Sequence, residues 1–153
     1  MSNQKLLDKI EKVWAALRAS CEGLTPDQME QPGVGGDWSV KNILSHVTTW
    51  EEESLKHLPV IAAGETPPSY KRQYGGIDAF NAQMIAEKRA LPLDEVLRQL
   101  DATHRRLIDY IAAAPDEQFA SKTRCRRRLG WDSYNHYPHH EKTIREWRAA
   151  QGI

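Results

Sequence analysis

Residues 39–58 read SVKNILSHVTTWEEESLKHL and carry two neighbouring stripes of side chains at helical spacing. The first stripe is apolar apart from one serine and consists of Val40, Ile43, Leu44, Val47, Ser54 and Leu58. The second stripe follows the i, i+4, i+7, i+11 series and consists of His46, Trp50, Glu53 and His57. Ser39 precedes the first apolar residue and is a favourable N-cap. This stretch predicts a helix from Ser39 to about Leu58, with one face in a core and the adjacent face lining a pocket.

Four further segments repeat the helical spacing of apolar residues. They are expected to run from Lys5 to Cys21, from Ile77 to about Ala90, from Leu93 to a boundary at Pro115, and from a start between Asp132 and Asn135 to about Ala149. Residues 59–76 are rich in proline and glycine and predict a long crossover, while residues 121–129 are expected to be the least regular part. Because strand-like alternation is absent, the pattern predicts an all-α antiparallel helical bundle.

Size and charge limit the classes of protein to consider. The 153 residues fit a single domain spanning residues 1–153. With 21 basic and 21 acidic residues the formal net charge is zero, which gives no argument for a nucleic-acid or membrane partner. The sequence has no apolar run of membrane-spanning length and no secretory core at its start, so we expect a cytoplasmic protein. Cys21 and Cys125 lie far apart and are expected to be free thiols.

Three histidines in two of the predicted helices are candidate metal ligands. His136 and His140 are four residues apart, which puts them on one face of a helix, and His46 lies on the pocket-facing stripe. Neutral imidazole is a good ligand for zinc, nickel, copper and iron, and three histidines with an open fourth position suit a catalytic metal. Two histidines four apart also arise by chance, so the alternative is a set of hydrogen-bonded core histidines without a metal. Pro138 lies between the pair and bends the helix unless it falls in the first turn.

Two stretches of the chain resemble helix motifs of one known family. The run WSVKNILSH at residues 38–46, followed by Trp50-Glu51, resembles the second-helix motif of the DinB-like, YfiT-type bundle proteins. The run YNHYPHH at residues 134–140, followed by IREW at residues 144–147, resembles their last-helix motif. Residues 77–81 and 97–107 are similar to the middle helices, so the resemblance covers nearly the whole chain.

The resemblance implies a fold and a cofactor. It implies an up-down-down-up four-helix bundle with a long crossover between helices 2 and 3, often a homodimer. It also implies a divalent metal, commonly nickel or zinc, on three histidines, and His46, His136 and His140 fall on those positions. Relatives include thiol-dependent transferases and isomerases and the colibactin self-resistance hydrolases, so a low-molecular-weight thiol is an expected cosubstrate. The fold carries over more safely than the reaction.

Other residues near the histidines have candidate roles in a pocket. Glu53 lies two turns beyond His46 and is the candidate general base or the hydrogen-bond acceptor for a metal-binding histidine. The alternative is an exposed carboxylate on the helix surface. The candidate pocket residues are Trp50, His104, Tyr137 and His139. Trp50 and His104 also fit plain core positions, and His139 is the rival of His140 because i+3 faces i as well. His57 is expected at the surface.

The arginine-rich stretch has two interpretations. Arg124 to Arg128 either hold an anionic substrate at the pocket mouth, such as a carboxylate-bearing thiol, or form a solvated loop. Cys125 among these arginines is either a reactive thiol of depressed pKa or an inert one. The preferred function is a metal-dependent hydrolase or thiol transferase acting on a small electrophilic molecule. The alternatives are a non-catalytic small-molecule binder and a dimeric stress or interaction protein whose histidines are structural.

Overall fold

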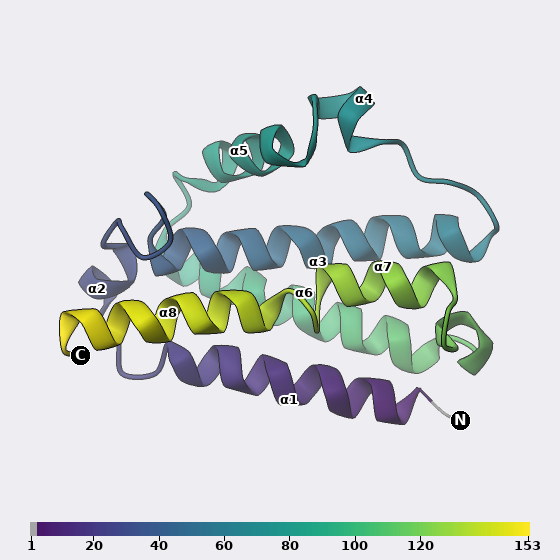
Figure 1. The fold of residues 1–153 in the computed structure, drawn as a ribbon, viewed down its shortest axis with the longest axis horizontal. Helices are drawn as coiled ribbons and strands as arrows, with labels where there is room; N and C mark the ends of the chain where they lie inside the picture. Colours follow the sequence, from purple (N-terminus) through teal and green to yellow (C-terminus); the bar gives the residue numbers. More distant parts are fainter. Residues whose placement is uncertain (1–2) are drawn as a thin grey trace.

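Four long helical rods form the body of the protein, in a computed structural model that describes residues 3–153. The rods are α1 (Gln4–Ser20), α3 (Val40–Ala62), α6 (Leu93–Ala113), and α7 (Arg124–Asp132) followed end to end by α8 (Tyr137–Gln151). In Figure 1, α3 and α6 run in one direction while α1 and the α7–α8 rod run in the other. Within residues 3–153 there is no β-strand, only an isolated bridge between Gly35 and Trp38. These observations confirm the predicted all-α, up-down-down-up bundle.

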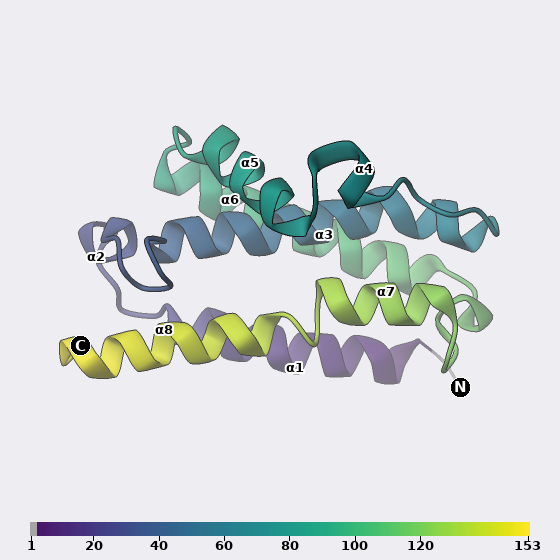
Figure 2. The same cartoon turned by 45° about the horizontal axis from the view of Figure 1, so that its top comes forward.

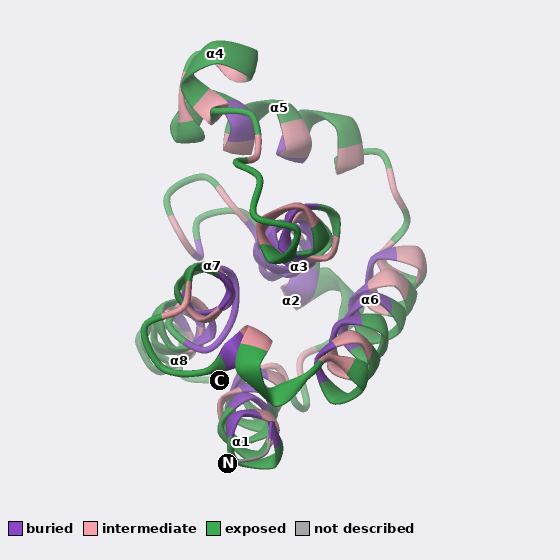
Figure 3. Ribbon diagram, turned by 90° about the vertical axis from the view of Figure 1, so that its right-hand side faces the viewer, coloured by how far each residue is buried: buried purple, intermediate pink, exposed green. Residues whose placement is uncertain are grey.

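The apolar stripes of the rods meet along the bundle axis. Figure 3 shows the buried faces of α1, α3, α6, α7 and α8 turned toward one another, with exposed residues outside. Fully buried members of this core include Ile10 and Leu17 of α1, Leu44 and Leu58 of α3, and Leu100, Leu107 and Ile111 of α6. Burial of each such side chain contributes roughly 1.5–3 kcal/mol. Packing among the rods, rather than helix propensity, therefore holds α3 in place.

Reciprocal capping boxes fix the starts of two helices, α3 and α2 (Pro26–Glu30). Ser39 accepts a hydrogen bond from the backbone N–H of Asn42, and the Asn42 side chain accepts one from the backbone N–H of Ser39. Thr25 and Gln28 make the same reciprocal pair at α2. Such a box satisfies donors that the first turn leaves unpaired. The start of α3 is thus fixed seven residues before His46, as the sequence predicted.

The crossover differs from its prediction. Helix α3 does not end before Pro59 but continues to Ala62, with Pro59 inside it. Proline removes one internal hydrogen bond, and the last turn closes nevertheless because the Ala63 N–H donates to the Pro59 carbonyl. The predicted crossover contains one short helix, α4 (Tyr70–Tyr74), and it is followed by α5 (Ile77–Lys88), which confirms the helix predicted from Ile77; both lie on the outer side of α3 (Figures 2 and 3). The apolar spacing of this segment predicts Ile77, Phe80 and Met84 on its inner face; Phe80 is buried as predicted, whereas Ile77 is half exposed.

The basic stretch is also more regular than predicted. After the short 3-10 turn η1 (Asp116–Phe119), residues 124–132 form α7, capped by the Thr123 hydroxyl, which accepts from the Arg126 N–H. Cys125 and Leu129 are buried four residues apart on its inner face. These two apolar positions in a run of arginines are enough to anchor a helix against α3. The prediction of irregular structure here was wrong.

Within the part of the chain that the structure describes, no helix is both long enough and apolar enough to cross a membrane. The expectation that the chain starts without a secretory core also involves residues 1–2, which lie outside the described range.

Candidate metal centre

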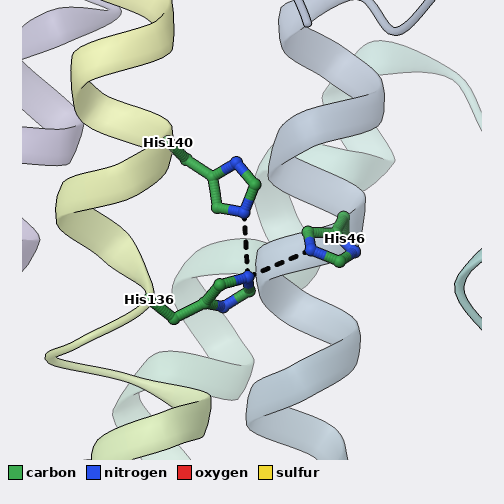
Figure 4. Close-up of side chains that lie close together, drawn as sticks. All are labelled: His46, His136 and His140. Carbon is green, nitrogen blue, oxygen red and sulfur yellow. Dashed lines mark hydrogen bonds between the residues drawn. The ribbon is translucent and has the colours of Figure 1, made fainter. Parts of the chain in front are cut away.

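The three histidines meet between α3 and the start of α8. The Nε2 atom of His136 lies 3.0 Å from Nε2 of His46 and 2.8 Å from Nε2 of His140. Figure 4 shows the three rings pointing their nitrogens at one another across the gap between the helices. One nitrogen from each ring lies within 4.8 Å of the others, so a single cation can contact all three. The bundle therefore brings together side chains that are ninety residues apart in the sequence.

A break between α7 and α8 positions His136. Helix α7 ends at Asp132, Ser133 leaves the helical conformation, and α8 begins at Tyr137 with His136 in the N-cap position. The Asn135 N–H donates to the Gly130 carbonyl at 2.9 Å across this turn. A Cβ atom on Gly130 would lie 2.9 Å from the Tyr134 hydroxyl, so any larger residue at this position would force the Tyr134 side chain to move.

The proline between the two histidines fits the first turn. Tyr137 is the first residue of α8 after the N-cap, and Pro138 is the second. Backbone N–H groups in the first turn have no partner within the helix, so a proline here removes no helical hydrogen bond. His136 is the N-cap residue of α8 and has helical dihedral angles, so it lies one turn before His140 and on the same face, as the i, i+4 spacing predicted. The predicted start between Asp132 and Asn135 was too early, because that segment forms the break.

The close nitrogens cannot all be explained by hydrogen bonds. Each imidazole nitrogen carries either one proton or one in-plane lone pair. Nε2 of His136 can therefore make only one of its two short contacts, to His46 or to His140, as a hydrogen bond. The other contact would have to share the same proton or lone pair and so be poorly directed, whereas a cation accepts all three lone pairs at once. The donor set thus fits a divalent metal.

Burial keeps these histidines neutral, the form that binds metals. Burial, followed by the neighbouring histidines, lowers the pKa of His46 to about 3 and that of His140 to about 2. Burial and His139 lower the pKa of His136 to about 4, opposed by the backbone carbonyl of Asp132. That carbonyl does not complete a well-formed bond, and Nδ1 of His136 is buried without a partner among the described residues. At neutral pH all three rings carry a free lone pair.

A cavity of about 300 Å³ opens beside the histidines. Its walls come from α3, α4, α5, α7 and the break. The lining consists of His46, Trp50, Tyr70, Ile77, Asn81, Arg128, Trp131, Asp132 and His136. A larger cavity of about 620 Å³ lies between the start of α1 and η1, but its lining includes none of these histidines. The smaller cavity is therefore the relevant one for chemistry at the three rings.

A charged network forms another part of the cavity wall. The Arg128 Nε donates to Asp132 Oδ2 at 2.6 Å, and its Nη2 donates to the Tyr70 hydroxyl at 2.6 Å. Tyr70 in turn donates to Glu53 at 2.9 Å, and the Ser54 hydroxyl donates to Asp132 Oδ2 at 2.7 Å. Burial raises the pKa of Asp132 to about 6 against the opposing effect of Arg128. Asp132 is thus a carboxyl group poised to exchange a proton near neutral pH.

Glu53 lies behind Tyr70 in this network. Its carboxylate also contacts Nε2 of His57 at 3.3 Å, and it is not part of the cavity lining. His57 is buried, so its expected surface position was wrong: Glu53 and the Tyr70 ring cover it. The role of Glu53 as a base stays a prediction, and its contact with the cavity runs through the Tyr70 hydroxyl.

The four predicted pocket residues are divided among three places. Trp50 lines the cavity and donates to Asn81 at 2.9 Å. His139 is exposed, with its ring beside that of His140. His104 and Tyr137 are buried on another side of α3 and do not line the cavity beside the three histidines.

His104 and Tyr137 belong to a second buried polar cluster. Oε2 of Glu51 accepts from the Tyr137 hydroxyl at 2.5 Å and lies 2.6 Å from Nδ1 of His104. Nε2 of His104 lies 2.8 Å from Glu11, and the ring stacks on Trp14 at 3.6 Å. Burial opposes protonation of His104, but the two carboxylates outweigh it and raise the pKa of His104. The geometry is that of the satisfied core histidine offered as the alternative.

The arginine-rich stretch separates into different environments. Arg128 lines the cavity, Arg124 donates to the Glu65 backbone, and Arg127 is exposed. Cys125 is buried, and burial raises its pKa, which is the reverse of what a reactive thiol needs. The interpretation of Cys125 as reactive is therefore not supported.

Sequence reasoning missed much of the cavity wall. Tyr70 and Asn81 come from the crossover helices, and Trp131 and Asp132 from α7, none of which had been assigned to a site. One signal was available: Leu129 and Asp132 continue the spacing of Cys125 at i+4 and i+7, which would have predicted a helix. The faces of α4 and α5 had no comparable signal.

Comparisons with known proteins agree with the fold. The sequence pattern of the DinB superfamily matches residues 9–146. An uncharacterised protein from Escherichia coli UTI89 has a TM-score of 0.85 at 15% identity, covering 99% of this chain and 95% of that one. The structure named Sibling Lethal Factor Precursor, DfsB, has a TM-score of 0.82 at 18% identity, covering 99% and 97%.

A third structure is the colibactin self-resistance protein ClbS in complex with a dsDNA, with a TM-score of 0.78 at 18% identity, covering 95% of this chain and 94% of that one. At such identities the likeness shows the fold alone. No curated protein matches the chain.

Proposed function

The chain belongs to the DinB superfamily, and on this premise we propose that it is a metal-dependent enzyme acting on a small electrophilic molecule. His46, His136 and His140 would hold the divalent cation, zinc or nickel. The observation that carries the proposal is the pair of short contacts at Nε2 of His136, of which only one can be a hydrogen bond. A bound cation would act as a Lewis acid and activate a water or a thiol.

The remaining residues of the cavity have roles that follow from their contacts. Both hydrogen bonds to Asp132 use Oδ2 and leave Oδ1 outside them, so Oδ1 is the proton acceptor that we propose for the reaction. Glu53 holds the Tyr70 hydroxyl in place rather than contacting the substrate. Trp50 walls the cavity and limits access of water to the histidines. The chain thus supplies a metal site, a base and an apolar wall within one cavity.

Elemental analysis tests the metal site. The protein is purified without a metal-affinity tag, because nickel leaches into three-histidine sites. We expect close to one zinc or nickel per chain in the wild type and a loss to near background in His136→Ala. His139→Ala is the matched control, since His139 is a neighbouring but exposed histidine. A metal-free wild type, together with unchanged stability of His136→Ala, would overturn the metal site.

Turnover separates the two reactions that such a site supports. Model electrophiles, such as an activated ester and an aryl halide, are offered with and without a low-molecular-weight thiol. Product formed without thiol indicates a hydrolase, and product formed only with thiol indicates a transferase. The expected signature in both cases is a loss of at least about 100-fold in kcat/KM on chelation, with recovery on adding zinc or nickel. Binding without turnover in either series would favour the non-catalytic small-molecule binder.

Two questions about partners have separate tests. We propose a homodimer, as the resemblance implies, and light scattering of the purified protein measures its mass. We propose that nucleic acid is not the main partner, because the formal net charge of zero gives no argument for one, although the similar ClbS structure holds a dsDNA. Fluorescence anisotropy with a labelled duplex in about 150 mM salt tests this, and saturable binding would contradict the expectation.

A further inference from the structure

Arg128 places a fixed positive charge in the wall of the cavity. Its side chain is largely buried, and its guanidinium is held by Asp132 through Nε and by the Tyr70 hydroxyl through Nη2. These bonds leave Nη1 outside them, and Arg128 is one of the residues that line the cavity. A guanidinium fixed by two of its nitrogens loses little conformational freedom when the third binds a ligand.

Apolar and aromatic surface surrounds this charge. The Arg128 guanidinium lies 6.0 Å from the centre of the Trp50 ring and 5.6 Å from that of Tyr70. At the mouth of the cavity, Trp131 is 68% exposed and Ile77 is 50% exposed, although both are large and apolar. Exposed apolar side chains gathered around a concave site mark a surface that a ligand covers. The lining thus suits a ligand that is mostly apolar and carries one group for Arg128.

We propose that the substrate is a small molecule with a flat apolar body and a single carboxylate, which Arg128 binds through Nη1 while the body lies between Trp50 and Trp131. This inference rests on the proposed function and narrows its substrate class. The cavity volume of about 300 Å³ accommodates a molecule of one or two rings. The carboxylate would anchor the molecule on one side, so that its opposite end faces the histidines.

The charges around Arg128 favour a carboxylate over a phosphate. Asp132 already shares the guanidinium, and Glu53 lies on the far side of Tyr70. A phosphate dianion would bring a second negative charge against these two carboxyl groups. A carboxylate brings one charge and has the geometry that a guanidinium edge recognises.

A matched pair of probes tests the proposal. Phenylacetate and phenylacetamide have the same ring and nearly the same shape, and they differ in charge. Isothermal titration calorimetry of the wild type should show phenylacetate binding about tenfold more tightly, the range expected for a charge-assisted hydrogen bond. The titration is performed on both the metal-loaded and the chelator-treated protein, because a carboxylate can also bind a metal directly. The preference must persist in the chelated protein.

Variants assign the preference to one residue. In Arg128→Gln the two probes should bind equally, and Arg128→Lys should keep only part of the preference because it retains the charge without the fork. Arg127→Gln is the matched control, since it removes the same charge from an exposed position of α7. Circular dichroism melts establish that each variant is folded, and the wild-type titrations alone remain decisive if Arg128 variants do not fold.

Three results would overturn the inference: equal binding of the two probes by the wild type, a preference that vanishes on chelation, or a preference unchanged in Arg128→Gln. Tighter binding of phenylphosphonate than of phenylacetate would also overturn it, in favour of a phosphate site. Failure of the metal proposal is distinguishable, because it appears in the elemental analysis and leaves the chelated titrations unaffected.

Discussion

Two clusters of histidines pack against different sides of α3, and the pKa values of their histidines are shifted in opposite directions. In the three-histidine cluster, His46, His136 and His140 point nitrogens at one another, no carboxylate of the described residues is hydrogen-bonded to them, and burial lowers their pKa values. In the carboxylate cluster, His104 lies between Glu51 and Glu11, and its pKa is raised. Both histidine sets are largely buried. The comparison teaches that burial alone does not decide the state of a histidine, because the partner of each ring nitrogen does.

The largest expected effect comes from breaking the carboxylate cluster. Glu51 is fully buried, accepts from Tyr137 and contacts Nδ1 of His104, so Glu51→Ala leaves that nitrogen and the Tyr137 hydroxyl without this partner in the core. We expect a loss of about 3–5 kcal/mol in the free energy of unfolding, measured by urea denaturation of the metal-free protein. Glu52→Ala, which removes the neighbouring half-exposed carboxylate paired with Lys88, should lose less than about 1 kcal/mol. Similar losses in the two variants would show that the buried Glu51 carboxylate contributes no more to stability than the exposed Glu52 carboxylate.

Zinc should stabilise the protein through one cluster only. At a free zinc concentration about 100 times the Kd, linkage adds about 2.7 kcal/mol to the free energy of unfolding. His140→Ala should lose this gain, because it removes one of the three converging nitrogens. His104→Gln should keep it despite a lower baseline, and His139→Ala should behave as the wild type. The separation of the clusters would be wrong if His104→Gln also abolished the zinc effect.

The two clusters should respond to pH in opposite directions in the metal-free protein. The pKa of His140 is lowered in the folded state, so its contribution to stability is present above 6.5 and is lost as the pH falls. The pKa of His104 is raised, so its contribution is present below 6.5 and is lost as the pH rises through the folded value. Each contributes about 1.4 kcal/mol per pH unit within its window.

Thermal unfolding across about pH 5 to 9 measures this difference. His140→Asn should flatten the acid side of the stability curve, and His104→Gln should flatten the alkaline side. If His104→Gln altered the acid side instead, the assignment of a protonated His104 would fail.

The smallest expected effect comes from removing the Tyr137–Glu51 hydrogen bond, which links the two clusters. Tyr137 follows His136 directly and donates its hydroxyl to Glu51. Tyr137→Phe should lose about 1 kcal/mol of stability, the usual value for one hydrogen bond. Zinc affinity, measured by competition with a chelator, should fall less than about tenfold, since outer contacts of a metal site have modest effects. A larger fall would mean that the carboxylate cluster holds His136 in position.

The sequence predicted the long rods and the three converging histidines better than it predicted the cavity around them. Apolar stripes such as Leu100, Leu107 and Ile111 repeat over many turns, so packing and pattern agree. Glu51 was not singled out because it stands in the run Glu51-Glu52-Glu53, where a buried carboxylate has the same local pattern as an exposed one. Only its partners on other helices, His104 and Tyr137, reveal the burial. Arg128 was not separated from its neighbouring arginines for the same reason.

The break between α7 and α8 has a consequence for how such a protein can diverge. Because the turn at residues 133–136 interrupts the hydrogen-bonded ladder, the rotation of α7 about its axis is set independently of that of α8. Arg128, Trp131 and Asp132 on one half-helix can therefore be exchanged without shifting His140 on the other. The α7–α8 rod thus contains two segments, so that cavity residues on α7 can change during evolution while the three histidines keep their positions.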